Sequence, residues 1–234
     1  MRMLRAAGVL VCAVAALAGC ATRLAADPPP GVRLAGNWKL DPAASDDPQK
    51  VLAQMRAEAI KIIDRRLNAP PPPPPRPGQH GGTSSQSQEQ YEDAAQTQPG
   101  PGGQRPDPLQ RSPMAHVILT TLARGDFLTV RQTPGEMVFD YGTSTRNFTP
   151  GARSVVSAEG GVGDQTSGWK GREYVIEIRA QLGPDVTERY GLSADGRQLV
   201  ETLHIGSGEL PAITLRRVYY STSETAPQQL PTND

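Results

Sequence analysis

The feature that most constrains this chain is a run of alternating apolar and polar residues at 122–220. In the segment 174–182 every second residue is apolar, and Glu177 and Arg179 lie between these positions. A period of two places one face of a β-strand on a core and the other in water. Because no segment of helical period interrupts the run, the sequence predicts consecutive strands that pair antiparallel in an up-and-down meander.

Glycine-bearing turns support this meander. Asp195-Gly196 lies between two amphipathic segments, and glycine takes a positive φ at little steric cost. Thr133-Pro134-Gly135 lies between two earlier segments in the same way. The alternation is weaker at 142–166, where stretches 147–151 and 160–163 indicate turns. The strands of the meander are predicted at residues 127–131, 137–141, 153–158, 174–182, 186–192, 199–205 and 213–220.

The N-terminal residues indicate a targeting segment rather than part of the fold. Arg2 and Arg5 precede a short apolar run at 9–17, which leads into Leu17-Ala18-Gly19-Cys20. A run this short is typical of a cleaved secretory signal and not of a membrane-spanning helix. The segment resembles a bacterial lipoprotein signal peptide, whose lipobox has this Leu-Ala-Gly-Cys form. An ordinary secretory signal with an accidental cysteine is the alternative.

The lipoprotein resemblance implies cleavage before Cys20, lipidation of its thiol and acylation of its new amino group. Several acyl chains on one residue exceed the two signals that stable anchoring requires. Ala21 follows the cysteine where inner-membrane retention would use Asp, so in a Gram-negative host the resemblance implies the outer membrane, facing the periplasm. Because Cys12 leaves with the signal, we expect no disulfide and no cysteine metal site in the mature chain.

The composition of the remaining chain indicates its partners and its domain organisation. Its 24 basic and 24 acidic residues argue against a nucleic-acid partner. A long stretch rich in Pro, Gly and Gln cannot bury enough apolar surface to offset its chain entropy, so we interpret it as a disordered insertion within one domain. The predicted organisation is a signal peptide at 1–19, a lipidated tether at 20–32, a first strand and helix at 33–68, the insertion at 69–112, the β meander at 113–221 and a disordered tail at 222–234.

One amphipathic helix is predicted at about 48–67. Asp47 is a good N-cap residue, and Pro48 suits the first helical position. Apolar residues then recur at intervals of three and four along one face. We expect this face to pack on an open end or face of the sheet. A helix that binds a membrane surface or a partner is the alternative, and the mixed charge and lack of aromatic residues favour packing.

The first strand, at 34–40, contains Gly36-Asn37-Trp38. Gly-x-Trp on a first strand is similar to the lipocalin and wider calycin pattern, in which the Trp closes one end of an up-and-down barrel. A basic residue of the last strand packs across that Trp, so the resemblance implies a lipocalin-like or partly open barrel closed by Trp38 with Arg216 or Arg217. Ordinary core packing is the alternative. In both cases Trp38 should be buried, and its strand should pair beside the last strand.

Two glutamates of the meander are candidate site residues. If Leu192 faces Leu199 across the later hairpin, then Tyr190 faces Glu201. In that register Glu188 and Glu201 lie diagonally on the apolar-patterned face, within interaction range.

Carboxylates on an inward face suggest three alternatives. Glu188 and Glu201 would be hydrolytic acid and base groups, or polar anchors in a ligand cavity. The simplest interpretation is a half-covered face, on which both are solvated or paired with Arg189 or Arg217. If both were buried and close together, the pKa of at least one should rise through desolvation and mutual repulsion.

Motifs of catalysis and cofactor binding are missing from the sequence. His80, His116 and His204 show no paired metal-ligand spacing, and there is no P-loop, nucleophile elbow or dinucleotide fingerprint. The wider layout resembles uncharacterised bacterial lipoproteins, which brings no activity with it. We therefore expect no metal, no cofactor and a non-enzymatic, membrane-anchored protein for binding or envelope maintenance, which holds a small apolar ligand or an envelope protein. A hydrolase that cleaves an envelope polymer through a carboxylate pair is the alternative.

Overall fold

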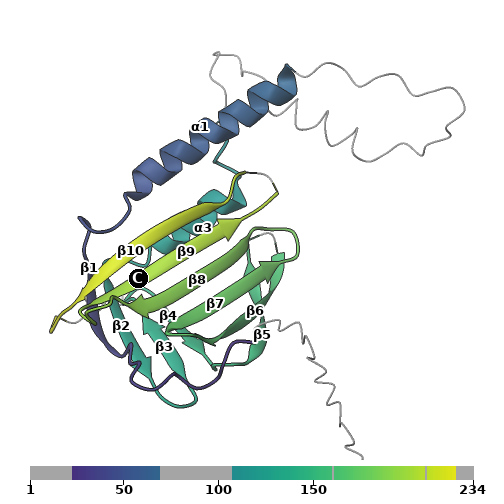
Figure 1. Ribbon diagram of the computed structural model, residues 1–234. Helices are drawn as coiled ribbons and strands as arrows, with labels where there is room; N and C mark the ends of the chain where they lie inside the picture. Colours follow the sequence, from purple (N-terminus) through teal and green to yellow (C-terminus); the bar gives the residue numbers. More distant parts are fainter. Residues whose placement is uncertain (1–22, 69–106, 160, 209, 225–234) are drawn as a thin grey trace, which may run out of the picture.

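The computed structural model describes residues 23–68, 107–159, 161–208 and 210–224. The signal segment, Cys20, residues 69–106 of the predicted insertion and residues 225–234 of the predicted tail lie outside these residues, so what the sequence predicts for them stays a prediction. Residues 107–112, the end of the predicted insertion, are described, and Leu109 among them is buried. The described part is mainly β, with one curled sheet and two helices (Figure 1). Its elements are β1 (Gly36–Leu40), α1 (Pro48–Leu67), α3 (Pro113–Leu122), β2 (Phe127–Gln132), β3 (Met137–Asp140), β4 (Thr145–Phe148), β5 (Arg153–Ala158), β6 (Gly161–Lys170), β7 (Glu173–Ala180), β8 (Asp185–Leu192), β9 (Gln198–Gly206) and β10 (Ile213–Ser221).

The ten strands form a half-barrel in the order β4-β3-β2-β1-β10-β9-β8-β7-β6-β5. Every pair is antiparallel, and consecutive strands pair with each other except β4 and β5, which form the two edges. β1 joins the two meanders, because it pairs with both β2 and β10. The predicted fold class, an up-and-down meander in a partly open barrel, is confirmed, and so is the position of the first strand beside the last.

The predicted hairpins are also confirmed. Gly196 takes a φ of +71° in the turn between β8 and β9, and Leu192 pairs with Leu199 as the alternation requires. The two turns predicted at 147–151 and 160–163 were both too long, because strands include some of these residues. β4 runs through Phe148, and β6 begins at Gly161 and includes the predicted turn residue Gly163. A Cβ on Gly163 would lie 3.1 Å from the carbonyl oxygen of Arg179 on β7, so this glycine permits close strand pairing.

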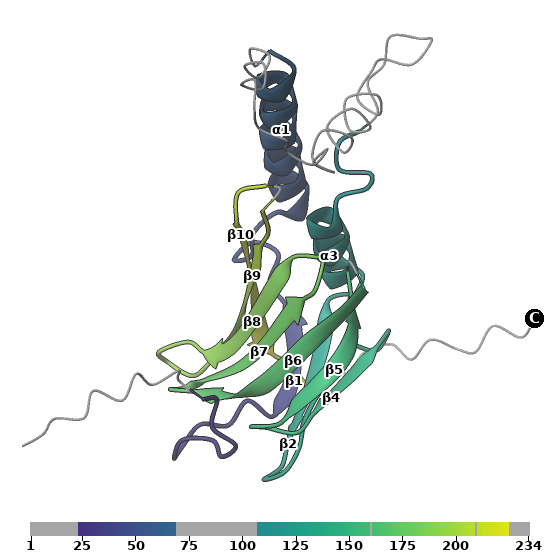
Figure 2. The same ribbon diagram turned by 90° about the vertical axis from the view of Figure 1, so that its right-hand side faces the viewer.

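Helix α1 spans the predicted residues and begins as predicted, with the Asp47 side chain accepting a hydrogen bond from the Gln49 amide. Its buried face consists of Leu52, Met55 and Ala59. These residues belong to a cluster that includes α3 and the segment before it, so α1 reaches the sheet mostly through α3. Figure 2 shows α1 standing beyond the end of the sheet, with α3 nearer to it.

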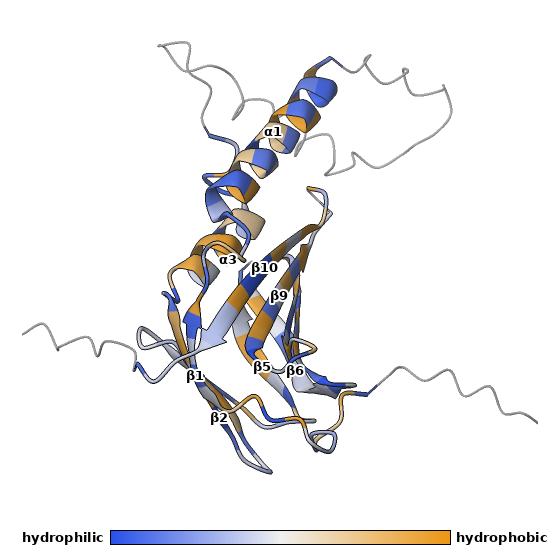
Figure 3. Ribbon diagram, turned by 60° about the vertical axis from the view of Figure 1, so that its left-hand side comes forward, coloured by the Kyte–Doolittle hydropathy of each residue, from blue (hydrophilic) through white to orange (hydrophobic). Residues whose placement is uncertain are grey.

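The second helix was not predicted, since residues 113–122 fell within the expected β meander. Ser112 caps α3 by accepting from the Ala115 amide, and a proline occupies the first turn. The β-branched residues of α3 favour strands in isolation, but burial of its apolar face overrides that preference. The helix is largely hydrophobic (Figure 3) and packs at the end of β9 and β10. The residues that it buries are Met114, Ala115, Ile118 and Thr121.

Part of the predicted N-terminal tether packs on the barrel. Ala25 forms a bridge with Trp169 of β6, with both backbone hydrogen bonds at 2.8 Å. Val32 and Leu34 are buried in the core. Gly168 permits this approach, because a Cβ there would lie 2.6 Å from the Ala25 carbonyl oxygen. Among the described residues, neither helix has the length and apolar character needed to cross a bilayer.

Aromatic side chains fill the interior of the curl. Phe139 of β3 lies against Tyr190 of β8, with ring centroids 4.3 Å apart, and 5.8 Å from Tyr174 of β7. Phe148 of β4 lies 6.3 Å from the same Tyr174 ring. The wall formed by β3 and β4 therefore contacts the wall formed by β7 and β8 directly, across the interior of the half-barrel.

Candidate functional site

Glu188 and Glu201 lie where the alternation places them. Glu188 pairs with Leu203 and Tyr190 pairs with Glu201 in the β8–β9 register. Both glutamates point into the curl, where Glu188 is 2% exposed and Glu201 is 0% exposed. The half-covered face that seemed simplest from the sequence is therefore wrong, because the opposite wall and α3 cover it completely.

Two arginines from other parts of the chain pair with these carboxylates. Arg124, which follows α3, places Nη2 2.9 Å from Oε1 of Glu188 and Nη1 3.2 Å from Oε1 of Glu201. Arg146 of β4 places Nη1 2.5 Å from Oε2 of Glu188. Arg189, one of the expected partners, instead lies 3.3 Å from Glu173 on the outward face. Both arginines are thus distant from the carboxylates in sequence and lie outside their hairpin.

Tyrosine hydroxyls donate further hydrogen bonds to the two carboxylates. The Tyr190 hydroxyl lies 2.8 Å from Oε2 of Glu188, 3.0 Å from Oε1 of Glu201 and 2.8 Å from the Tyr141 hydroxyl. A hydroxyl has one proton, so when Tyr190 donates to a carboxylate it accepts from Tyr141. Tyr219 donates to Oε2 of Glu201 at 2.9 Å. Within the described part of the chain, every buried side-chain nitrogen and oxygen has a hydrogen-bond partner.

Arg217 links this network to the second helix. Its Nη1 donates to the carbonyl oxygen of Thr121 at 3.0 Å, and its Nη2 donates to that of Gly125 at 2.7 Å. Thr121 lies in the last turn of α3, where free carbonyls and the helix dipole attract a cation. Arg217 also lies 3.9 Å from Oε2 of Glu201, so of the two expected arginine partners this one does pair with a glutamate. The Arg217 guanidinium of β10 therefore links the end of α3 to Glu201 of β9 in the sheet.

The predicted closure of the barrel by an arginine over Trp38 is not formed. Trp38 is buried as expected, but its Nε1 donates to the Leu34 carbonyl at 3.0 Å. Arg217 lies over the Tyr219 ring instead, at 5.4 Å, and Arg216 points outward to the Ala44 carbonyl. The register explains the difference: Trp38 pairs with Ser221, which is about 13 Å along β10 from Arg217.

The electrostatics of the network oppose proton transfer. Burial by itself would raise the pKa of Glu188, but the charges of Arg124 and Arg146 outweigh it and hold this pKa well below its ordinary value. The sequence predicts a rise for at least one of the two carboxylates through desolvation and mutual repulsion, but for Glu188 the pKa falls, because the cations dominate. Burial, with the nearby charge of Glu201, raises the pKa of Tyr141 to about 12. At neutral pH Glu188 is an ionised acceptor and Tyr141 a neutral donor.

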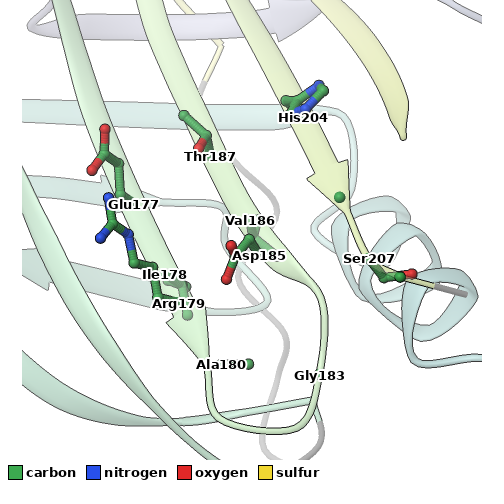
Figure 4. A pocket seen from close by; sticks show the side chains of 12 residues that line it. Glu177, Ile178, Arg179, Ala180, Gly183, Asp185, Val186, Thr187, His204 and Ser207 are labelled. Carbon is green, nitrogen blue, oxygen red and sulfur yellow. The ribbon is translucent and has the colours of Figure 1, made fainter. Parts of the chain in front are cut away.

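A separate hollow of about 620 Å³ lies at the ends of β7, β8 and β9 (Figure 4). Glu177, Thr187 and His204 form one cross-strand row along it, and Arg179 lies beside them. His204 is exposed and makes its hydrogen bond with Thr214, at 3.1 Å. No group of three or more His, Cys, Asp or Glu side chains gathers to hold a metal in the residues that the structure describes.

Arg124, Arg146 and the three tyrosines of the network were not predicted as site residues, whereas Arg217 was. A glutamate at an apolar-face position does indicate a buried partner, since an unpaired buried charge is very costly. The alternation cannot say which arginine supplies it. Arg124 lies in a connection after a helix, and Arg146 lies in a short strand within a stretch rich in turn residues.

The sequence matches no protein-family model and no curated protein. Among solved structures, apo lipid binding protein 8 of Caenorhabditis elegans is similar with a TM-score of 0.40 and 12% identity, covering 82% of this chain and 99% of that one. The REP1-NXSQ fatty acid transporter has a TM-score of 0.36 and 9% identity, covering 82% and 98%. A zebrafish ileal bile acid-binding protein complexed with cholic acid has a TM-score of 0.32 and 17% identity, covering 46% and 80%.

Proposed function

We propose that this chain is a lipid-anchored, non-enzymatic protein of the bacterial envelope that acts by binding a partner protein at its surface. The observation that carries the proposal is the filled interior. Aromatic rings from β3 and β7 and β8 meet across the half-barrel, and the polar groups beside them are hydrogen-bonded to one another. A small-molecule carrier needs an apolar cavity at this place, and an enzyme needs free chemical groups in a cleft.

The carboxylate pair does not support the alternative hydrolase. A general acid needs a pKa raised towards the working pH, whereas the pKa of Glu188 is lowered by its arginines. Glu201 is fully buried and accepts from Tyr219 and Tyr190, so a polymer chain has no access to it. The two glutamates serve in this proposal as structural anchors for Arg124 and Arg146.

The anchor in the proposal is Cys20, whose lipobox lies outside the described residues. Substituting Cys20→Ser should move the protein from the membrane fraction to the soluble fraction of the envelope and remove its labelling by fatty acid. Cys12→Ser is the matched control, because that cysteine belongs to the segment that the signal peptidase removes. Unchanged lipid labelling of the Cys20→Ser variant would contradict the anchor.

Native mass spectrometry tests the binding mode. The protein is extracted from its own envelope in mild detergent, and we expect assemblies that contain another polypeptide and no small apolar molecule. A second spectrum, of the chain beginning at Ala21 and purified from the same envelope, should show the bare polypeptide mass. A small apolar molecule retained through both preparations would overturn the partner proposal in favour of a ligand carrier.

A further inference from the structure

The two edges of the half-barrel are built differently. β4 has four residues, carries the inward-pointing Arg146 and is followed by Pro150 within two residues of its end. Short length, inward charge and proline are the features by which natural proteins protect an edge from pairing. β5 has six residues, and after Arg153 it contains no charge and no proline. Its sequence Arg153-Ser154-Val155-Val156-Ser157-Ala158 leaves the edge unprotected.

The same interior contacts that close the curl leave β5 open. Arg146 and Phe148 draw β4 towards Glu188 of β8 and Tyr174 of β7, rather than towards β5. In the described part of the chain, β5 pairs with β6 and with no other strand. The outward-facing Val155 is 71% exposed, an unusual environment for a β-branched apolar residue in a strand.

We propose that β5 pairs with the β5 strand of a second copy of this chain, about a two-fold axis that passes between Val155 and the partner's Val155. An antiparallel pair related by such an axis has opposing residues on the same face, so Val155 contacts its own counterpart. Arg153 then faces the partner's Ser157, and Ser154 faces the partner's Val156. No like charges oppose each other in this register, which is a condition for stable cross-strand pairing.

The symmetry also explains why pairing would stop at two copies. A two-fold interface uses the same strand on both subunits and leaves no second copy of it free. The edges that remain are the two β4 strands, which their length, Arg146 and Pro150 protect. The result is a closed dimer with one continuous sheet. This proposal does not rest on the identity of any envelope partner.

Disulfide trapping tests the register directly. The chain beginning at Ala21 keeps every described residue and has no cysteine, since its natural ones are Cys12 and Cys20. Opposed residues of an antiparallel pair have Cα atoms about 4.5–5.5 Å apart, within disulfide range. The Val155→Cys variant should therefore form a covalent dimer under mild oxidation. Val162→Cys is the control, because Val162 is also exposed but lies on β6, one strand from the edge. Equal cross-linking of the two variants would overturn the proposal.

Sedimentation of the cysteine-free chain supplies a second readout. We expect a monomer–dimer equilibrium whose dissociation constant rises about tenfold or more in Val155→Lys, because two ammonium groups would then meet at the axis. Val162→Lys should leave the equilibrium unchanged, and circular dichroism should show both variants folded. A wild-type monomer at all concentrations up to about 100 μM, or an unaffected Val155→Lys, would refute the β5 dimer.

Discussion

Arg146 on the edge strand β4 reaches across the half-barrel to Glu188 on β8, where Nη1 lies 2.5 Å from the carboxylate. This contact joins the edge strand β4 to a strand that lies six positions further along the sheet order. It closes the interior together with the aromatic rings beside it, and it turns a charged residue of β4 inward. The closed interior supports the non-enzymatic proposal, and the inward charge is why β4 and β5 differ as edges.

Replacing Glu188 by Gln should strongly destabilise the fold. The variant keeps the size of the side chain but leaves Arg146 buried without its counter-ion and Arg124 with Glu201 alone, and breaking a buried pair in this way typically costs about 3–5 kcal/mol. Glu173→Gln is the matched control, because its pair with Arg189 is partly solvated and should be worth less than about 1 kcal/mol. Urea unfolding followed by tryptophan fluorescence measures both. Similar losses for the two variants would contradict a dominant role of the buried pair.

Acid should remove the stabilisation that Glu188 supplies. Its pKa is lower in the folded state than in the unfolded chain, where it is about 4.3. The unfolded state therefore binds more protons as the pH falls below about 5, and the free energy of unfolding decreases. We expect the stability difference between the wild type and Glu188→Gln to be constant near neutrality and to shrink progressively below about pH 4. A difference that stays constant down to about pH 2 would show that Glu188 is not the ionised partner.

Arg217→Met should loosen α3 without unfolding the sheet. The substitution keeps an apolar stem but removes the donors to the Thr121 and Gly125 carbonyls at the end of the helix. Hydrogen exchange should become faster at the amides of α3 and change less in β7 and β8. Arg216→Met is the control, since Arg216 contacts Ala44 before α1. Faster exchange of α3 in the control as well would indicate a general loss of stability instead.

Gly168→Ala should detach the N-terminal segment from β6. A Cβ at this position would lie 2.6 Å from the Ala25 carbonyl oxygen, so either the bridge to Trp169 breaks or the strand shifts. Overpacking of this kind costs about 1–3 kcal/mol, and the Ala25 amide should lose its protection from exchange. Gly135→Ala, in open space at the β2–β3 turn, should change neither quantity. A protected Ala25 amide in Gly168→Ala would show that the segment can dock without the close approach.

Much of this fold could be predicted because its signals are local. Period-two alternation indicates a strand within a few residues, and Asp195-Gly196 sets the register that places Glu188 and Glu201 inward. The same is true of α1, whose cap and apolar face lie within one segment. Helix α3 has a local N-cap signal at Ser112, but its β-branched residues favour a strand. Only its contact with the end of the sheet decides between helix and strand.

The sequence by itself determined the strands, the hairpin register and the side of the sheet on which each glutamate lies, because a side chain's face follows from its neighbours along the strand. The tertiary structure alone decided which charges meet those glutamates. Arg124 lies 77 residues from Glu201, and Arg146 lies 42 residues from Glu188. It also decided that the walls contact each other, that β5 pairs with β6 alone among the described strands and that the pKa of Glu188 falls. The physical reason is that burial and Coulomb energy depend on distances in space, which the curl of the sheet sets and sequence separation does not.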